Sequence, residues 1–337
     1  MIEPRRALER WLSREDLSGP EVEHLFGLLM DGRIDEAMKA GLLVALAAKG
    51  EASHEIAGAA RAMRARVRRV EHSRAGVVDT CGTGGDGMGT FNVSTAAAVV
   101  AAAAGAPVAK HGNRAVSSRS GSADLLAALR VPVELEPEQT ARLLEQVGLA
   151  FLFAPRHHPA MREVMPVRHA LGVRTVFNLL GPLTNPAGAE RQLLGVFSRT
   201  RVLPVAEVLA ELGCVHALVV HGSDGLDELT TTGSTFVAEV RGRQVETYEI
   251  APEDLGVRRV RLEAIAGGTP EENARLAERL FAGAEGPVAD IVALNAGAAL
   301  FVAGLVPDLG AGLARAREAL GGRAAEAKLE EVRSFAW

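Results

Sequence analysis

The chain has 337 residues, of which 48% are hydrophobic and 23% are charged, and its formal net charge is −5. This length allows one large domain or two ordinary ones with a sizeable core, and the acidic balance excludes a global basic field for nucleic acid. Two cysteines, Cys81 and Cys214, are too few for a disulfide framework and fit a reducing cytosol, so we expect a cytoplasmic protein. The sequence has no apolar run of about 18 residues, so we expect no membrane span.

Residues 1–70 show helical patterns throughout. Helices are predicted over 20–30, 35–49 and 53–67, and Ser53 is a candidate N-cap for the third. These segments contain no strand-like alternation, so we expect a small all-helical domain at this end of the chain.

From residue 77 onwards, short strand-like runs alternate with helical runs such as 137–147 and 203–212. The predicted strands span 77–80, 107–110, 149–153, 193–197 and 217–221. This alternation predicts a mostly parallel central sheet flanked by helices. A helical run over 159–171 interrupts the alternation, and we expect it to pack back on the N-terminal helices.

Two further strands are expected over 236–240 and 247–250, and the end of the chain, 271–334, is predicted to be helical. The predicted fold class is therefore α/β, with a small all-helical N-terminal domain and a larger α/β domain. The small domain takes residues 1–70, joined by helices from about 159–185, and the larger domain takes residues 71–337.

A loop with five glycines between residues 82 and 89 follows the first predicted strand and precedes an Ala-rich helical run over 96–104. Glycine permits positive φ and close approach of a ligand, and free N–H groups ahead of a helix attract phosphate. Asp86 lies in the same loop, where it would repel phosphate unless a metal or a sugar hydroxyl stood between them. The loop therefore predicts a site for a metal-loaded phosphosugar.

The same glycines, beginning at Gly82, also fit the dinucleotide spacing G-x-G-x-x-G. However, the loop continues through 88–92, where that pattern should open a helix, and no acid follows about 20 residues later. A Walker A motif is excluded because no Gly-Lys-Ser/Thr follows. A dinucleotide site and a purely structural glycine loop remain the less favoured alternatives.

Two polar segments accompany the glycine loop. Residues 92–95 lie at the start of the Ala-rich helix, where Ser94 and Thr95 either cap the helix or bind phosphate oxygen or Mg²⁺. Residues 110–118 follow the second strand, at the sheet edge where ligands of parallel sheets bind, and suit a pyrophosphate and a polar acceptor. Lys110 is one of four lysines beside 33 arginines, which indicates that a compact ammonium is needed there. Ser122 either joins this site or caps the next helix.

Asp227 and Glu228 form a carboxylate pair in the loop after the predicted strand 217–221. Such pairs are usually surface charge, but at the same sheet edge as a phosphate loop they predict a Mg²⁺ site. His157, His158 and His169 are a weak zinc candidate, because no cysteine or carboxylate stands at ligand spacing from them.

Arg168 lies in the helical run over 159–171, and its planar fork suits a substrate carboxylate. The alternative is a surface arginine in an arginine-rich chain. The sequence gives no further signal that decides between the two.

These motifs together resemble the anthranilate phosphoribosyltransferase family over essentially the whole chain. The resemblance is carried by Asp79 with the 82–86 loop, 92–95, 110–114, 174–186, 227–229, 267–274 and 290–296. Thr230, where Ser is common, and His169, where another basic residue is common, are small departures beside the site.

The resemblance implies a helical domain plus an α/β domain, and a homodimer joined through the helical domain. It implies transfer of the 5-phosphoribosyl group of 5-phosphoribosyl 1-pyrophosphate (PRPP) to the amine of anthranilate. Two Mg²⁺ ions per monomer would be bound by Ser94, Asp227 and Glu228. No acid or base is assigned, because the aromatic amine is neutral at pH 7.

The resemblance also implies two sets of substrate contacts. PRPP would contact Gly82, Gly85, Asp86, Thr90, Asn92, Val93, Ser94, Thr95, Lys110, His111, Gly112, Asn113, Arg114, Ala115, Val116, Ser117, Ser118 and Ser122. Anthranilate would contact Gly82, Asn113, Arg168, His111, His158 and Gly181.

Two alternatives stay open at this stage. A pyrimidine nucleoside phosphorylase on the same fold is disfavoured, because its Lys-His-Ser-Thr-Gly-Gly type of phosphate loop is replaced by Gly-Thr-Gly-Gly-Asp. An inactive relative that binds nucleic acid is disfavoured by the net charge of −5 and by the presence of Arg168, Asp227 and Glu228.

Overall fold

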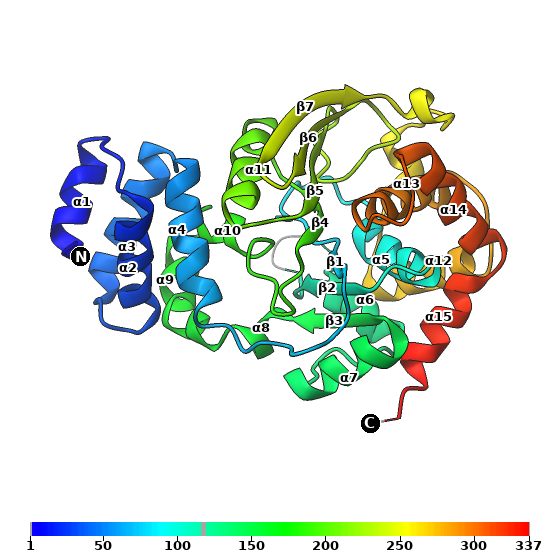
Figure 1. The fold of residues 1–337 in the computed structure, drawn as a ribbon, viewed down its shortest axis with the longest axis horizontal. Helices are drawn as coiled ribbons and strands as arrows, with labels where there is room; N and C mark the ends of the chain where they lie inside the picture. Colours follow the sequence, from blue (N-terminus) through cyan, green and yellow to red (C-terminus); the bar gives the residue numbers. More distant parts are fainter. Residues whose placement is uncertain (1, 116–118, 337) are drawn as a thin grey trace.

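The computed structural model describes residues 2–115 and 119–336, and its N-terminal helices form a bundle at one end of the molecule (Figure 1). The helices are α1 (Pro4–Leu12), α2 (Gly19–Met30), α3 (Glu36–Lys49) and α4 (Ser53–Arg64). Contacts between α1 and α3 and between α2 and α4 build the bundle, which confirms the expected helical domain. Among the described residues no helix is both long and apolar enough to cross a bilayer.

The start of α4 corrects one expectation. Ser53 is the first helical residue rather than the N-cap, and the Ala52 N–H is held by the Glu55 carboxylate at 3.0 Å. Glu55 is buried, and it also accepts hydrogen bonds from Trp11 Nε1 at 2.8 Å and the Leu17 N–H at 2.9 Å. The buried Glu55 carboxylate thus caps the start of α4 and links this helix to α1. The capping pattern in the sequence does not predict the second role.

A seven-stranded sheet forms the centre of the larger domain. Its strands are β1 (Val78–Asp79), β2 (Val108–Gly112), β3 (Leu149–Phe153), β4 (Arg191–Gly195), β5 (His216–Gly222), β6 (Thr235–Arg241) and β7 (Gln244–Ile250). Their order is β3-β2-β1-β4-β5-β6-β7, and all pairs from β3 to β5 are parallel, whereas β6 and β7 add antiparallel edge strands. The predicted mostly parallel sheet is confirmed.

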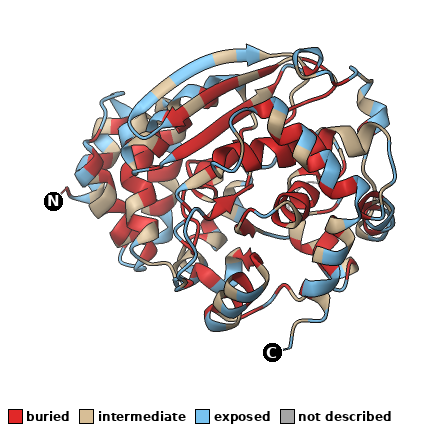
Figure 2. Ribbon diagram, turned by 45° about the vertical axis from the view of Figure 1, so that its right-hand side comes forward, coloured by how far each residue is buried: buried red, intermediate tan, exposed pale blue. Residues whose placement is uncertain are grey.

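Helices cover both faces of the sheet, and Figure 2 shows the central strands almost wholly buried between them. One face packs on α5 (Val93–Ala103) and α13 (Pro287–Val302), and the other on α11 (Val202–Glu211). The remaining helices of the larger domain are α6 (Ser122–Ala128), α7 (Pro137–Val147), α12 (Pro270–Phe281), α14 (Leu309–Gly321) and α15 (Ala324–Arg333). The helical end predicted over 271–334 is confirmed as four helices.

The segment between β3 and β4 returns to the helical bundle. It contains α8 (Ala154–His157), a 3-10 turn at Pro159–Glu163, α9 (Met165–Leu171) and α10 (Phe177–Leu180). The single helix expected over 159–171 is wrong, because Pro166 lacks an N–H and is tolerated only in the first turn of a helix. Helix α9 contacts α3, and α10 contacts α4, so this segment brings its side chains to the boundary between bundle and sheet.

Candidate active site

The glycine loop leaves the carboxyl end of β1 and lies against the loop that follows β5. Gly84, Gly85, Gly87 and Gly89 have φ between +63° and +78°, a region that residues with a Cβ rarely adopt. Gly82 is required by proximity instead, because a Cβ there would lie 2.8 Å from Asp227 Oδ2. The close packing of these two loops brings the predicted phosphate loop onto the predicted metal carboxylates.

Asp227 and Glu228 are held by main-chain donors of the glycine loop and of the helix that follows it. Asp227 Oδ2 accepts from the Gly84 N–H at 2.9 Å, and Glu228 Oε1 accepts from the Ser94 N–H at 3.0 Å. Desolvation and the nearby Asp86 carboxylate raise the pKa of Asp227 to about 7. Desolvation and Asp227 raise the pKa of Glu228 well above its usual value. Asp86, Asp227 and Glu228 thus lie on two facing loops without enough nearby positive charge to balance their three negative charges.

A divalent cation would supply that charge. The donor set, two carboxylates and the hydroxyl of Ser94, consists of the hard oxygen ligands that Mg²⁺ prefers. The first two ligands come from the loop after β5 and the third from the first turn of α5, so the fold itself assembles them. The residues present thus fit the ion.

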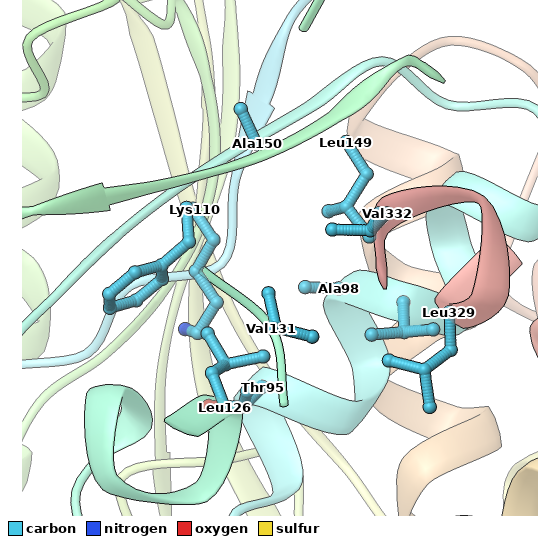
Figure 3. A pocket seen from close by; sticks show the side chains of 11 residues that line it. Thr95, Ala98, Lys110, Leu126, Val131, Leu149, Ala150, Leu329 and Val332 are labelled. Atoms are coloured by element: carbon cyan, nitrogen blue, oxygen red, sulfur yellow. The ribbon is translucent and has the colours of Figure 1, made fainter. Parts of the chain in front are cut away.

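Lys110 lies under this site rather than in the loop after β2. The strand continues to Gly112, so Lys110 and His111 are strand residues, which corrects the expected strand end at residue 110. Figure 3 shows the aliphatic stem of Lys110 along a small apolar void of about 20 Å³ between strands and helices. The ammonium donates to the Thr80 carbonyl at 2.8 Å and lies 3.2 Å from Ser94 Oγ.

This placement gives Lys110 a defined electrostatic role. The buried ammonium opposes the rise in pKa of both Asp227 and Glu228, and it fixes Ser94 at the start of α5. The rare lysine therefore marks a buried counter-charge, as its isolation among arginines indicates. Its nitrogen already has three acceptors among the described residues, Thr80 O, Thr80 Oγ1 and Ser94 Oγ.

His111 and His158 form a buried pair on the other side of β2. Their Nε2 atoms are 3.2 Å apart, and His111 Nδ1 lies 3.0 Å from the Gly181 carbonyl oxygen. Because a carbonyl only accepts, the proton of neutral His111 belongs on Nδ1, and His158 donates to His111 Nε2. Burial lowers the pKa of His111 to about 4 and that of His158 well below its usual value, so both rings are neutral at physiological pH.

Asp79, Cys81 and His111 also place possible metal ligands within 4.8 Å of one another. However, Asp79 already accepts from the His111 N–H at 3.1 Å and from Asn185 Nδ2 at 2.7 Å. Both ring nitrogens of His111 are engaged as well. The cluster is therefore explained by hydrogen bonding that fixes the end of β1, and it does not require a metal.

Arg168 projects from α9 with its guanidinium stacked 5.7 Å from the centre of the Phe177 ring. It also contacts Met165 Sδ at 3.8 Å, and it forms no ion pair with a carboxylate among the described residues. Desolvation lowers its pKa, so an anionic ligand would be favoured there. An unpaired, half-buried guanidinium differs from the surface arginine that was the alternative.

The other predicted contacts are distributed around the same loops. Asn92 is the N-cap residue of α5 but makes no cap bond with its side chain, whose Nδ2 donates to the Ser120 carbonyl at 2.9 Å. Ser122 is the first residue of α6 and does not cap it, because Asp124 holds the Gly121 N–H at 3.0 Å. Val116, Ser117 and Ser118 lie outside the described residues.

Arg114 is a predicted contact whose side chain is already paired with acidic residues. Its guanidinium is exposed and pairs with Asp124 and Glu134 at 3.3 and 3.2 Å. Its neighbours Asn113 and Ala115 keep main-chain groups at the loop, where Ala115 N–H donates to Asp124 at 2.8 Å. Thr90 forms an isolated antiparallel bridge with Ala266.

Comparison with known proteins decides the family. A model described as the a/b domain of a glycosyl transferase family matches residues 74–325, and a model of the helical bundle domain matches residues 5–67. Anthranilate phosphoribosyltransferase from Rubrobacter xylanophilus is 54% identical over 330 residues, covering 97% of this chain and 95% of that protein. The chain belongs to the anthranilate phosphoribosyltransferase family.

Solved structures of anthranilate phosphoribosyltransferases share the whole fold. The crystal structure of the enzyme from Thermus thermophilus has a TM-score of 0.93 and 51% identity, with 98% of each chain covered. The Saccharomyces cerevisiae enzyme in complex with PRPP and Mg has a TM-score of 0.89 and 28% identity, again with 98% of each chain covered. These matches support the transferase and give no support to a nucleoside phosphorylase or an inactive nucleic-acid-binding relative.

Two supporting residues of this anthranilate phosphoribosyltransferase fold were not assigned a role from the sequence. Asn273 Nδ2 donates to Asn92 Oδ1 at 2.8 Å, and Asn273 Oδ1 accepts from the Gly268 N–H at 2.7 Å. Asn295 of α13 holds both main-chain groups of Leu229, at 3.0 and 2.8 Å. The motifs 267–274 and 290–296 can be recognised in the sequence. Their role in holding the loops of the site depends on tertiary contacts, which the sequence does not show.

Arg174 is a third residue without an assigned role. It lies in the segment between α9 and α10, stacks 4.3 Å from the centre of the Phe197 ring and donates to the Gly85 carbonyl. The Phe197 N–H in turn donates to Thr83 Oγ1 at 3.0 Å. Arg174 thus joins the returning segment to the glycine loop.

We expect Arg174→Gln to raise the KM for PRPP about tenfold and to leave the melting temperature nearly unchanged, because one charged hydrogen bond and one exposed stack are lost. Steady-state kinetics with varied PRPP measure this. Arg199→Gln is the matched control, since Arg199 stacks 4.6 Å from Phe236 and is exposed. Equal KM values in the two variants would show that Arg174 does not position the loop.

The raised pKa values also predict how Mg²⁺ and pH act on stability. The pKa of Asp227 is about 7 in the folded chain and close to 3.8 when unfolded, so its stabilising contribution is complete below pH 3.8 and is lost as pH rises through 7. We therefore expect Mg²⁺ to raise the melting temperature more at pH 8 than at pH 5. Calorimetry with Mg²⁺ and with EDTA tests this. In Asp227→Asn, the rise in melting temperature caused by Mg²⁺ should differ less between pH 8 and pH 5. An equal rise at both pH values in the unaltered protein would contradict the prediction.

Proposed function

We propose that the protein transfers the 5-phosphoribosyl group of PRPP to the amine of anthranilate, giving N-(5-phosphoribosyl)anthranilate and pyrophosphate. This is the second step of tryptophan synthesis from chorismate. The observation that carries the proposal is the hydrogen bonding of Asp227 to the glycine loop and of Glu228 to the first turn of α5, on the same sheet edge as the buried neutral histidines. The family membership and the yeast complex with PRPP and Mg support it.

In this proposal PRPP lies over the glycine loop and the first turn of α5. The proposed contacts to its phosphates are the main-chain groups of residues 82–86, the polar side chains of 90–95, and residues 110–118 with Ser122. Arg114 would contribute through its main chain unless its two ion pairs break. Lys110 acts from below, because its nitrogen is committed to Thr80 and Ser94.

Mg²⁺ would be held by Ser94, Asp227 and Glu228, with two ions per monomer. When bound, it supplies positive charge to the pyrophosphate that departs from C1. The glycine loop accommodates the phosphosugar. Asp227 and Glu228, whose pKa values are raised without a cation, would offer their carboxylate oxygens to it beside Asp86. Departure of the leaving group gives an oxocarbenium-like centre, as in glycoside cleavage.

Anthranilate is proposed to bind between Arg168 and the glycine loop, with Gly82, Asn113, His111, His158 and Gly181 around it. Arg168 would bind the carboxylate of anthranilate, because no carboxylate among the described residues is paired with it. The neutral histidine pair provides a rigid wall without adding charge beside the amine. Positioning and charge neutralisation therefore account for the rate, and no general base is assigned.

A homodimer through the helical domain belongs to the same proposal. Leu12 of α1 is 68% exposed and Val44 of α3 is 44% exposed, on two helices that contact each other. These exposed apolar side chains support an interaction surface on α1 and α3, because contiguous exposed apolar patches mark such surfaces. We also assign residues 1–70 with the helices from about 159–185 to one domain, residues 71–337 to the other, and the protein to the cytoplasm, where free Cys81 and Cys214 stay reduced.

The deciding experiment mixes the protein with PRPP, Mg²⁺ and anthranilate and follows the loss of anthranilate fluorescence. Loss that requires both PRPP and Mg²⁺, and that EDTA stops, is the expected result. Persistent fluorescence with a folded protein would overturn the proposed acceptor. A salt-dependent DNA titration would then test the inactive relative.

A further inference from the structure

A cavity of about 340 Å³ lies at the amino ends of the strands, at the opposite edge of the sheet from the glycine loop. Its lining includes residues 67 and 69–72, which connect the helical bundle to β1, and residues 185–190, which lead into β4. The ends of α4 and α11 complete it. The size falls within the range of small-molecule sites, and the position lies on the connection between the two domains.

Arg64 is the half-buried arginine of this cavity, whereas Arg69, also in the lining, is exposed. The Arg64 guanidinium donates from Nε to the Leu183 carbonyl at 2.7 Å and from Nη1 to the Leu212 carbonyl at 3.4 Å. Desolvation lowers its pKa, and none of the recorded ion pairs among the described residues includes it. Since guanidinium has five N–H donors, part of its donor capacity faces the cavity without an anion.

The walls are mixed in a way that suits an amphipathic ligand. Apolar side chains line it beside Arg64, namely Val67, Val70, Pro186, Ala187, Leu209 and Leu212. Glu71 and Glu190, also in the lining, are exposed, so neither substitutes for a buried anion. His72 is fixed by its Nε2, 2.8 Å from the Ala187 carbonyl oxygen, which leaves Nδ1 without a partner.

We propose that this cavity binds a small organic carboxylate with an apolar body, with the carboxylate on Arg64 and the body against the apolar side chains of the wall. Inorganic phosphate fits less well, because apolar side chains stand beside Arg64 and the second arginine of the lining, Arg69, is exposed. The ligand would thus be a second, non-substrate molecule bound far from the glycine loop.

Two hydrogen-bonded side chains connect the cavity to the proposed active site. Asn185 donates to Asp79 Oδ2 at 2.7 Å, and Asp79 accepts from the His111 N–H at 3.1 Å. Gln192 donates to the Pro182 carbonyl at 2.7 Å, next to Gly181. Occupation of the cavity is therefore expected to change anthranilate affinity, and anthranilate to change ligand affinity by the same factor. This coupling, unlike the binding itself, rests on the proposed function.

The test is isothermal titration calorimetry of the full chain with 3-phenylpropanoate, using 3-phenylpropanamide as the neutral control. We expect binding of the carboxylate, little binding of the amide, and at least tenfold weaker carboxylate binding in Arg64→Gln. Val67→Phe, which fills part of the cavity and keeps the Arg64 guanidinium, should also weaken binding. Circular dichroism shows whether each variant folds. If either Arg64→Gln or Val67→Phe does not fold, the other still tests the proposal.

Arg168→Ala distinguishes binding in this cavity from binding in the proposed anthranilate site. Carboxylate binding that persists in Arg168→Ala supports the cavity. Binding that is lost in Arg168→Ala and kept in Arg64→Gln would overturn the proposal, as would the absence of binding to the unaltered chain at millimolar ligand. Because calorimetry does not require turnover, failure here is distinct from failure of the fluorescence assay. A changed KM for anthranilate at saturating 3-phenylpropanoate would be the sign of coupling.

Discussion

Glu228→Gln is expected to lower Mg²⁺-dependent turnover by about a thousand-fold, the scale of losing one group that stabilises charge at the reacting centre. Glutamine keeps the length of the side chain and an oxygen that accepts from the Ser94 N–H, so the fold is little disturbed. The charge that attracts the cation is lost instead. Steady-state kinetics across a Mg²⁺ titration measure the effect, and excess Mg²⁺ should restore only part of the rate.

The melting temperature of Glu228→Gln without Mg²⁺ provides a second test. The Glu228 carboxyl resists ionisation because of desolvation and Asp227, so removing it should leave the melting temperature in EDTA unchanged or higher. The stabilisation by Mg²⁺ should shrink. Glu249→Gln, on the exposed face of β7, is the matched control for the loss of one glutamate. Near-normal turnover in Glu228→Gln would remove this residue from the metal site.

Much of this arrangement was predictable because it depends on local chemistry. Gly84 and Gly85 mark a backbone that needs positive φ, and the carboxylate pair after β5 marks a need for a cation. In a parallel sheet, the ends of neighbouring strands meet at one edge, so these motifs were expected to lie together. The strand centres also followed from apolar runs, and the run 149–153 coincides with β3.

The remaining features depend on contacts between distant residues, which a sequence pattern does not encode. Lys110 was predicted to contact PRPP, but its burial and its hydrogen bonds to Thr80 and Ser94 follow from strand pairing that continues to Gly112. Asn273 braces Asn92 across 181 positions of sequence. A proline signals locally that a helix cannot run through residue 166 unbroken. No local signal predicts the stacking of Arg174 on Phe197.

Arg168→Ala is expected to raise the KM for anthranilate about a hundredfold, with a smaller effect on kcat. A charge-assisted, forked hydrogen bond to a carboxylate in a partly desolvated site contributes about 3 kcal/mol, which corresponds to that factor. Arg168→Lys should recover part of the loss, because an ammonium keeps the charge but not the fork. Kinetics with varied anthranilate at saturating PRPP measure both variants.

The decisive comparison uses aniline, which has the reacting amine and lacks the carboxylate. If Arg168 binds that carboxylate, its removal should leave kcat/KM for aniline nearly unchanged, so that the variant discriminates poorly between the two amines. His169→Ala, at the neighbouring exposed position, should discriminate like the unaltered protein. An equal loss for anthranilate and aniline would instead mean that Arg168 supports α9 and Phe177, because a purely structural defect cannot distinguish a substrate with a carboxylate from one without it.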